Sequence, residues 1–254
     1  MSTAGLELSI LWPAFIAGLL VTSTHVPLGI QVLRRGIVFI DLAIAQIAGL
    51  GVIVADWFGF EPQGWAVQVS ALAAALAGAV VLTWTEKHWP DVQEALIGVM
   101  FILAASGALI VLAANPHGAE HLKDLLVGQI LWADPAQLPI VAAIYAVVVL
   151  VWFTLGERIG RIGFYLLFAC AVTVSVQLVG LYLVFTTLIV PALATRRYSR
   201  WRLACAYTLG AAGYAAGLIV SALSDWPSGP AIVWVMTGLA IIVFALGPRA
   251  VPAK

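Results

Sequence analysis

The feature that most restricts the fold of this chain is a succession of continuous apolar runs, each about 20 residues long, which is the helix length that crosses a bilayer core. Strands that cross an outer membrane show short alternating segments instead. The chain has 63% hydrophobic and 9% charged residues. This composition and the length of the apolar runs predict an all-α, polytopic bundle of transmembrane helices that forms a single domain over residues 1–254. The full spans are expected at residues 10–32, 37–58, 65–85, 94–114, 136–155, 162–178, 203–222 and 230–247.

The positions of Lys and Arg predict the orientation of these spans. Eleven of the twelve fall in alternate connections or at the C-terminus, and Lys123 is the exception. Because Lys and Arg accumulate in cytoplasmic loops, this side is expected to face the cytoplasm. The N-terminus is then expected outside and the C-terminus inside.

Residues 162–195 are too few for the two crossings that this orientation requires. Arg161 and Arg196 are expected on the same side, so the chain must cross and return between them, whereas two full spans need about 40 residues. We therefore expect a ninth, short or broken helix near residues 178–191, with the break at Gly180. Broken helices occur where the freed backbone faces protein or a water-filled cavity, so this region is expected to border a pathway. One long tilted helix is the alternative.

The end of this short run carries the densest positive charge in the chain. The apolar run reaches Pro191, passes through a turn of small residues and ends in four arginines. Apolar residues favour hydrocarbon and arginines favour water, so the chain is expected to leave the membrane here as a basic elbow that binds a partner. The candidate coupling residues are Pro191, Arg196, Arg197, Arg200 and Arg202.

Asp41 is the most informative polar residue inside a predicted span. Six residues past Arg35, it is expected about 9 Å further along a helix, below the membrane surface. A carboxylate there costs about 2.5–3.5 kcal/mol on insertion scales unless it is paired or hydrated, which makes it a candidate functional residue. It could equally be a structural partner of Arg34 or Arg35. Further pathway candidates are His25, for which an interhelical hydrogen bond is the alternative, Gln46 and Gln177.

A polar connection between the fourth and fifth spans contains a second candidate site. Its imidazoles and carboxylates recur at spacings of three and four, which places them on one face of a helix. Such a set suits a first-row divalent metal, and a solvated turn on the membrane surface is the alternative. The candidate ligands are His117, Glu120, His121 and Asp124.

Several activities are excluded or disfavoured by the sequence. A net charge of zero argues against a nucleic-acid partner. The phosphate-binding pattern G-x-x-x-x-G-K-[ST] is absent, so the chain is not expected to hydrolyse ATP or to be an enzyme. His117-Gly118-Ala119-Glu120-His121 matches the H-x-x-E-H pattern of some metalloproteases, but Gly118 after Pro116 is a poor helix interior. An ion-coupled secondary transporter that uses Asp41 stays open as an alternative.

Five short motifs follow one another in the order found in one known family. They are L-G…V-L-R-R…F-I-D from Leu28 to Asp41, Glu94 with Gly98, L-L-V-G-Q-I-L from Leu125 to Leu131, V-G-L-Y-L-V…I-V-P-A…R from Val179 to Arg196, and W-P-S-G-P from Trp226 to Pro230. Together they resemble the membrane (permease) subunits of metal-ion ABC importers, which take up zinc, manganese or iron.

The resemblance implies partners and a cargo for the chain. Two permease copies would pair around a pathway in a bacterial inner membrane, each binding a cytoplasmic ATP-binding subunit through the elbow, and an extracytoplasmic metal-binding protein would deliver the cargo. Zinc is the first choice and manganese the second, with no permanently bound cofactor. The chain departs from the family pattern D-x-x-x-H. At the position of the histidine, four residues after Asp41, it has Ala45, and Gln46 comes next.

Overall fold

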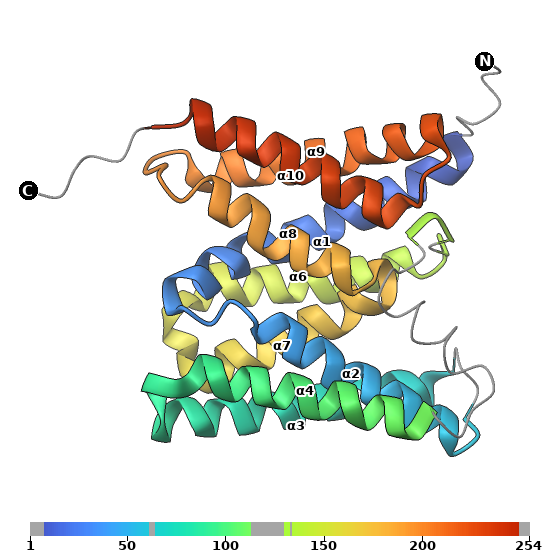
Figure 1. Ribbon diagram of the computed structural model, residues 1–254, viewed down its shortest axis with the longest axis vertical. Helices are drawn as coiled ribbons and strands as arrows, with labels where there is room; N and C mark the ends of the chain where they lie inside the picture. Colours follow the sequence, from blue (N-terminus) through green and yellow to red (C-terminus); the bar gives the residue numbers. More distant parts are fainter. Residues whose placement is uncertain (1–7, 61–63, 113–129, 133, 249–254) are drawn as a thin grey trace, which may run out of the picture. The chain divides into compact units, whose positions relative to one another are not determined.

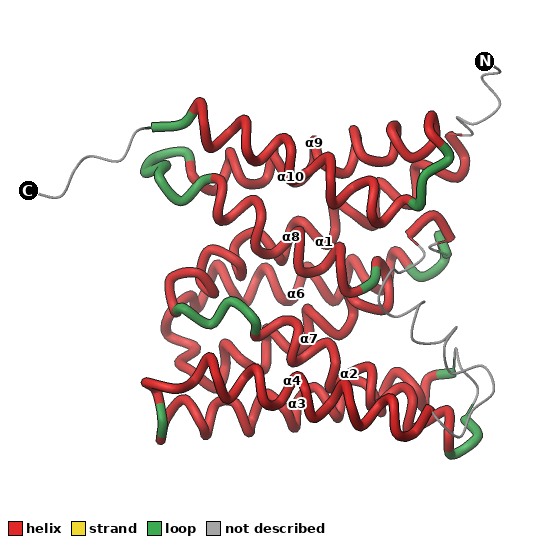
Figure 2. Tube along the Cα trace, viewed as in Figure 1, coloured by secondary structure: helices red, strands yellow, loops and turns green. Residues whose placement is uncertain are grey.

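The computed structural model describes residues 8–60, 64–112, 130–132 and 134–248. Within these ranges the regular secondary structure is entirely helical (Figure 2). Eight described helices are long and apolar enough to cross a membrane, and a ninth is shorter, so the expected polytopic helical bundle is confirmed. The helices are α1 (Leu8–Arg35), α2 (Ile40–Trp57), α3 (Trp65–His88), α4 (Gln93–Leu112), α6 (Leu138–Leu155), α7 (Gly160–Val179), α8 (Leu181–Ala194), α9 (Arg202–Ser224) and α10 (Ser228–Leu246).

The chain divides into two compact units whose segments alternate along the sequence. The first unit comprises Met1–Arg35, Val127–Val147 and Leu178–Lys254, and the second comprises Gly36–Leu126 and Val148–Gln177. The expectation of a single domain stays a prediction. Because each unit is assembled from distant segments, neither can be recognised from a break in composition.

In the first unit, α1 packs against α8 and α9, and α10 packs against the same two helices (Figure 1). Glycine allows the closest of these approaches. A Cβ atom placed on Gly29 of α1 would clash with the backbone oxygen of Leu188 in α8, so only a residue without a side chain fits this crossing. A Cβ on Gly217 of α9 would likewise lie 2.5 Å from the Cα of Ile232 in α10.

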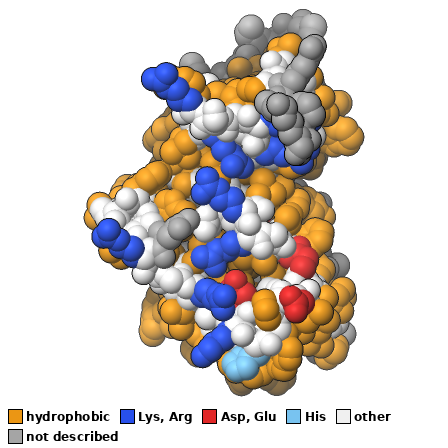
Figure 3. Space-filling view, turned by 90° about the vertical axis from the view of Figure 1, so that its left-hand side faces the viewer, with side chains coloured by type: hydrophobic (Ala, Val, Ile, Leu, Met, Phe, Trp, Pro, Cys, Tyr) orange, Lys and Arg blue, Asp and Glu red, His pale blue; other side chains and the backbone are white. Residues whose placement is uncertain are grey.

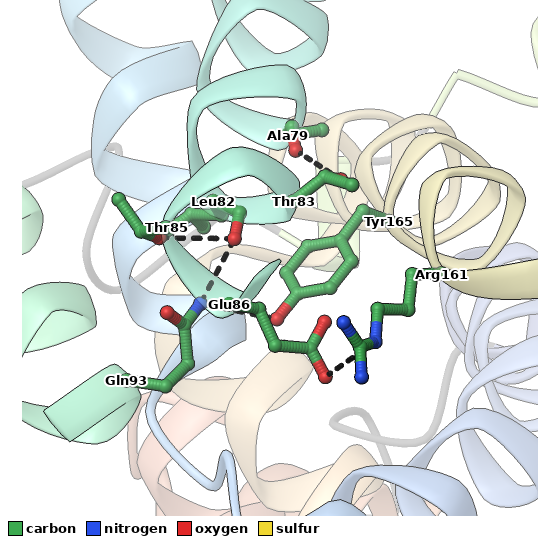
Figure 4. Close-up of polar contacts among 8 residues, drawn as sticks. All are labelled: Ala79, Leu82, Thr83, Thr85, Glu86, Gln93, Arg161 and Tyr165. Atoms are coloured by element: carbon green, nitrogen blue, oxygen red, sulfur yellow. Dashed lines mark hydrogen bonds and ion pairs between the residues drawn. The ribbon is translucent and has the colours of Figure 1, made fainter. Parts of the chain in front are cut away.

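In the second unit, α2 packs against both α3 and α4. A polar cluster ties α7 to these helices (Figure 4). The Gln93 amide at the start of α4 donates to the Leu82 carbonyl at 3.0 Å and to the Tyr165 hydroxyl at 3.2 Å. Beside it, Arg161 of α7 lies 3.8 Å from Glu86 of α3. Gln93 therefore links α3 and α7 through one buried amide group.

The predicted break at Gly180 is confirmed, and the alternative of one long helix is wrong. α7 ends at Val179, Gly180 has a φ of +84°, and α8 then runs for only 14 residues. The turn predicted directly after Pro191 is also wrong, because Pro191 lies inside α8 and the helix continues to Ala194. A proline loses one helical hydrogen bond but need not end the helix when its neighbours pack well.

Candidate functional site

Asp41 lies in the first turn of α2 and does not share a helix with Arg35. α1 ends at Arg35, Gly36 turns the chain with a φ of +71°, and α2 begins at Ile40. The predicted 9 Å separation along one helix is therefore wrong. The Asp41 side chain is fully buried, and neither carboxylate oxygen has a hydrogen-bond partner among the described residues.

Glu94, in the first turn of α4, is the acidic neighbour of Asp41 in the second unit. Its Oε1 accepts a hydrogen bond from the backbone N–H of Phe39 at 3.2 Å. Its Oε2 is shielded from solvent and has no partner among the described residues. The two carboxyl groups are close enough to repel each other. The beginnings of α2 and α4 thus bring together two acidic groups, each at a helix N-terminus that favours negative charge.

The pairing of Asp41 with Glu94 could not be found from sequence spacing, although both residues lie in the family motifs. Phe39, whose N–H binds Glu94, is 55 positions away along the chain. Apart from those motifs, the sequence signal was that each acidic residue stands close to the start of a predicted apolar span.

The other pathway candidates lie in different parts of the fold. His25 is fully buried in α1, with Nδ1 2.9 Å from the Thr24 hydroxyl and 3.1 Å from the Val21 carbonyl oxygen. Its Nε2 has no partner among the residues that the structure describes. Gln46 is half-buried in α2, and Gln177 is exposed near the end of α7. His25 belongs to the first unit and the two glutamines to the second, and their pathway roles stay predictions.

The predicted outer-loop ligands His117, Glu120, His121 and Asp124 lie outside the described residues. Within the described ranges, no group of three or more His, Cys, Asp and Glu side chains is placed to hold a metal ion. The role of these four residues stays a prediction.

The basic elbow is residues 195–201, between α8 and α9. Arg196, Arg197 and Arg200 are exposed on it. Arg202 differs, because it begins α9, is half-buried and donates a hydrogen bond to the Ala192 carbonyl at 3.3 Å. Arg202 thus satisfies one of the open carbonyls at the end of α8 and fixes the geometry of the elbow.

Basic side chains cluster at one end of each unit, taken separately (Figure 3). In the first unit, Arg34 at the end of α1 is close enough to Arg202 to repel it, so α1 ends beside the elbow. In the second unit, Lys87 in the last turn of α3 lies next to Glu86, which pairs with Arg161 at the start of α7. This clustering follows the charge pattern of the sequence within each unit, and the orientation of the termini stays a prediction.

These features define a multi-pass membrane protein with a short internal helix and a basic elbow. Residues 7–159 and 154–247 match the ABC 3 transport family. The chain belongs to that family, and the expected relation to permease subunits of metal-ion ABC importers is confirmed.

Relatives and a solved structure cover nearly the whole chain. An uncharacterized membrane protein of Synechocystis sp. is 26% identical over 244 residues, which cover 87% of this chain and 85% of that protein. The high-affinity zinc uptake system membrane protein ZnuB of Haemophilus influenzae is 23% identical over 246 residues, covering 88% and 92%. The structure of PsaBC from Streptococcus pneumoniae in complex with Fab has a TM-score of 0.77 at 19% identity and covers 95% of this chain and 93% of that one.

Proposed function

We propose that the chain forms the translocation pathway of an ATP-driven importer of divalent metal ions. Membership of the ABC 3 transport family supports the transport role, and the likeness to ZnuB, which is named as part of a zinc uptake system, supports a metal as cargo. Metal ions would cross through the chain, and a separate subunit would hydrolyse ATP.

The observation that carries this proposal is the pair of acidic residues Asp41 and Glu94. The two neighbouring carboxylates repel each other, and both oxygens of Asp41 and Oε2 of Glu94 are shielded from solvent without a hydrogen-bond partner among the described residues. Burial of such groups is unfavourable in the absence of a counter-charge. A divalent cation that passes between them would remove the repulsion, and both carboxylates would coordinate it. The pair therefore acts as a transient binding site for the cargo.

Zinc is the proposed cargo, and manganese is the second candidate. The similarity to ZnuB favours zinc, and the predicted ligands His117 and His121 would suit it at the outer mouth. Carboxylate oxygens at Asp41 and Glu94 suit manganese as well, because manganese prefers oxygen donors. Competition between the two ions in an uptake assay would decide between them.

The elbow is the proposed docking segment for the ATP-binding subunit. Arg196, Arg197 and Arg200 are exposed and positively charged, so they would bind an acidic surface. In this proposal the elbow and the C-terminus lie in the cytoplasm, and the N-terminus lies outside a bacterial inner membrane. The assembly would contain a second copy of the permease as a homodimer and an extracytoplasmic metal-binding protein.

Metal uptake by cells that carry Asp41→Asn tests the pathway role. Asparagine keeps the size of the side chain but removes the charge, so uptake of radioactive zinc should fall about tenfold or more. The matched control is Asp91→Asn, an exposed carboxylate in the short Pro90–Val92 helix, which should leave uptake unchanged. Normal uptake in Asp41→Asn at equal protein level would remove Asp41 from the pathway.

Reconstitution distinguishes ATP-driven import from ion-coupled secondary transport. Proteoliposomes that contain the chain and its ATP-binding subunit should take up zinc only when ATP is supplied. Pull-down with Arg196, Arg197 and Arg200 all changed to Glu should release the ATP-binding subunit. Retention of that subunit, or zinc uptake without ATP in the presence of an ion gradient, would contradict the proposal.

A further inference from the structure

Two consecutive arginines of the elbow share one aromatic ring at the end of α10. The Cζ atom of Arg197 lies 4.1 Å above the centre of the Phe244 ring, and that of Arg196 lies 5.4 Å from it. The next residue reinforces this contact, because the Tyr198 hydroxyl donates to the Val243 carbonyl at 3.1 Å. Three successive elbow residues therefore contact the last turn of α10.

The contact also depends on a residue without a side chain just beyond α10. A Cβ atom on Gly247 would lie 2.8 Å from Cε2 of the Tyr198 ring. The end of α10 and the elbow thus fit closely, and both belong to the first unit. This fit limits the conformations that residues 196–198 can adopt.

The Phe244 ring offsets the repulsion between the positive charges of Arg196 and Arg197. Arg196 and Arg197 are adjacent, exposed and carry the same charge, so without support their long side chains would move apart and sample many rotamers. The negative face of an aromatic ring attracts a guanidinium, and here it attracts two. Phe244 therefore holds both charges in one place.

Stacking leaves the arginines able to bind a partner. A guanidinium stacks through its flat face, whereas its five N–H donors point outward in its plane. No carboxylate of the described residues is paired with Arg196 or Arg197. The elbow thus presents two sets of N–H donors in the geometry that carboxylates accept.

We infer that Arg196 and Arg197, held on Phe244, form a preorganised double-guanidinium receptor for carboxylates on the surface of the ATP-binding subunit. The end of α10 is then part of the docking surface, with Phe244 as a positioning residue. This inference rests on the proposed function, in which the elbow binds that subunit.

Binding of the purified ATP-binding subunit to the full-length chain in nanodiscs tests the inference. Phe244→Leu keeps an apolar side chain but removes the ring, and should weaken binding about tenfold, because both stacking contacts that hold the guanidinium groups are lost. Phe244→Tyr keeps the ring and should restore binding to within about twofold. The matched control is Phe153→Leu, an exposed phenylalanine of α6, which should bind as the unchanged chain does.

A double-substitution cycle separates positioning from simple packing. Glutamine lacks both the positive charge and the guanidinium group, so Arg196→Gln with Arg197→Gln should weaken binding by itself. In that background Phe244→Leu should have little further effect, because no cation is left for the ring to hold. If the loss of binding free energy from the two arginine substitutions and the loss from Phe244→Leu simply add, Phe244 acts through packing alone and the inference is overturned. If Phe244→Leu folds poorly, Phe244→Met replaces it in this comparison, because methionine is also apolar and lacks the ring.

Failure of the inference and failure of the proposed function give different results. Arg200→Glu, on the part of the elbow that does not contact Phe244, should weaken binding if the elbow docks the ATP-binding subunit. If Arg200→Glu weakens binding and Phe244→Leu does not, only the inference is overturned. If the triple Glu variant at 196, 197 and 200 also binds normally, the docking role of the elbow is overturned as well.

Discussion

The hydroxyl of Tyr207 in α9 donates a hydrogen bond to the backbone carbonyl of Ser23 in α1, at 2.9 Å. Ser23 precedes Pro27 by four residues, and Pro27 lies inside α1. Because proline has no N–H, it cannot donate to the carbonyl four residues earlier. Tyr207 therefore satisfies the carbonyl that Pro27 leaves open, in a membrane span where water cannot.

Substitution of Tyr207 by Phe should lower the free energy of unfolding by about 1 kcal/mol, because the Ser23 carbonyl loses its partner. Unfolding in detergent at increasing temperature measures this loss. The same substitution in a Pro27→Ala background should have a smaller effect, since alanine has the backbone N–H that proline lacks. Equal losses in both backgrounds would show that Tyr207 does not act through this carbonyl.

Two substitutions of Glu94 separate its hydrogen bond from its charge. Glu94→Gln keeps an oxygen that can accept from the Phe39 N–H but removes the negative charge, so folding should persist while zinc uptake falls about tenfold. Glu94→Leu removes both, and should also lower the free energy of unfolding by about 1 kcal/mol. Uptake assays with protein-level controls, and thermal unfolding, give the two readouts. Full uptake in Glu94→Gln would limit Glu94 to a structural role.

Alanine at two glycines should have opposite effects on stability. In Gly29→Ala the added methyl group meets the Leu188 carbonyl, so α1 and α8 must separate and the free energy of unfolding should fall by about 1–3 kcal/mol. A Cβ on Gly98 of α4 meets nothing within 4 Å, so Gly98→Ala should raise the free energy of unfolding by about 0.5–1 kcal/mol. Thermal unfolding of the two variants beside the unchanged chain checks the predicted decrease and the predicted increase in stability.

Gly180→Ala should strain the junction between α7 and α8. Gly180 has φ +84° and ψ 162°, a region that is essentially restricted to glycine. We expect a loss of about 1–3 kcal/mol in unfolding free energy, measured in detergent. A stability equal to that of the unchanged chain would mean that the junction relaxes without cost.

Local properties of the sequence predicted the secondary structure well. The apolar runs located the spans, and the shortage of residues between Arg161 and Arg196 located the short helix and its break at Gly180. These predictions succeed because hydrophobic length and backbone freedom act within a few neighbouring residues. The same local reasoning failed at Asp41 and Pro191, where the true helix boundaries depended on Gly36 and on the packing around α8.

The amino-acid sequence by itself determined that the chain crosses a membrane many times, carries its positive charge in alternate connections and has an isolated acidic residue at Asp41. Only the tertiary structure decided that Asp41 lies near Glu94, that Tyr207 reaches Ser23 and that Phe244 lies under Arg197. Each of these pairs joins different parts of the fold. Their contacts depend on how the helices rotate and pack against one another, which no single stretch of sequence encodes.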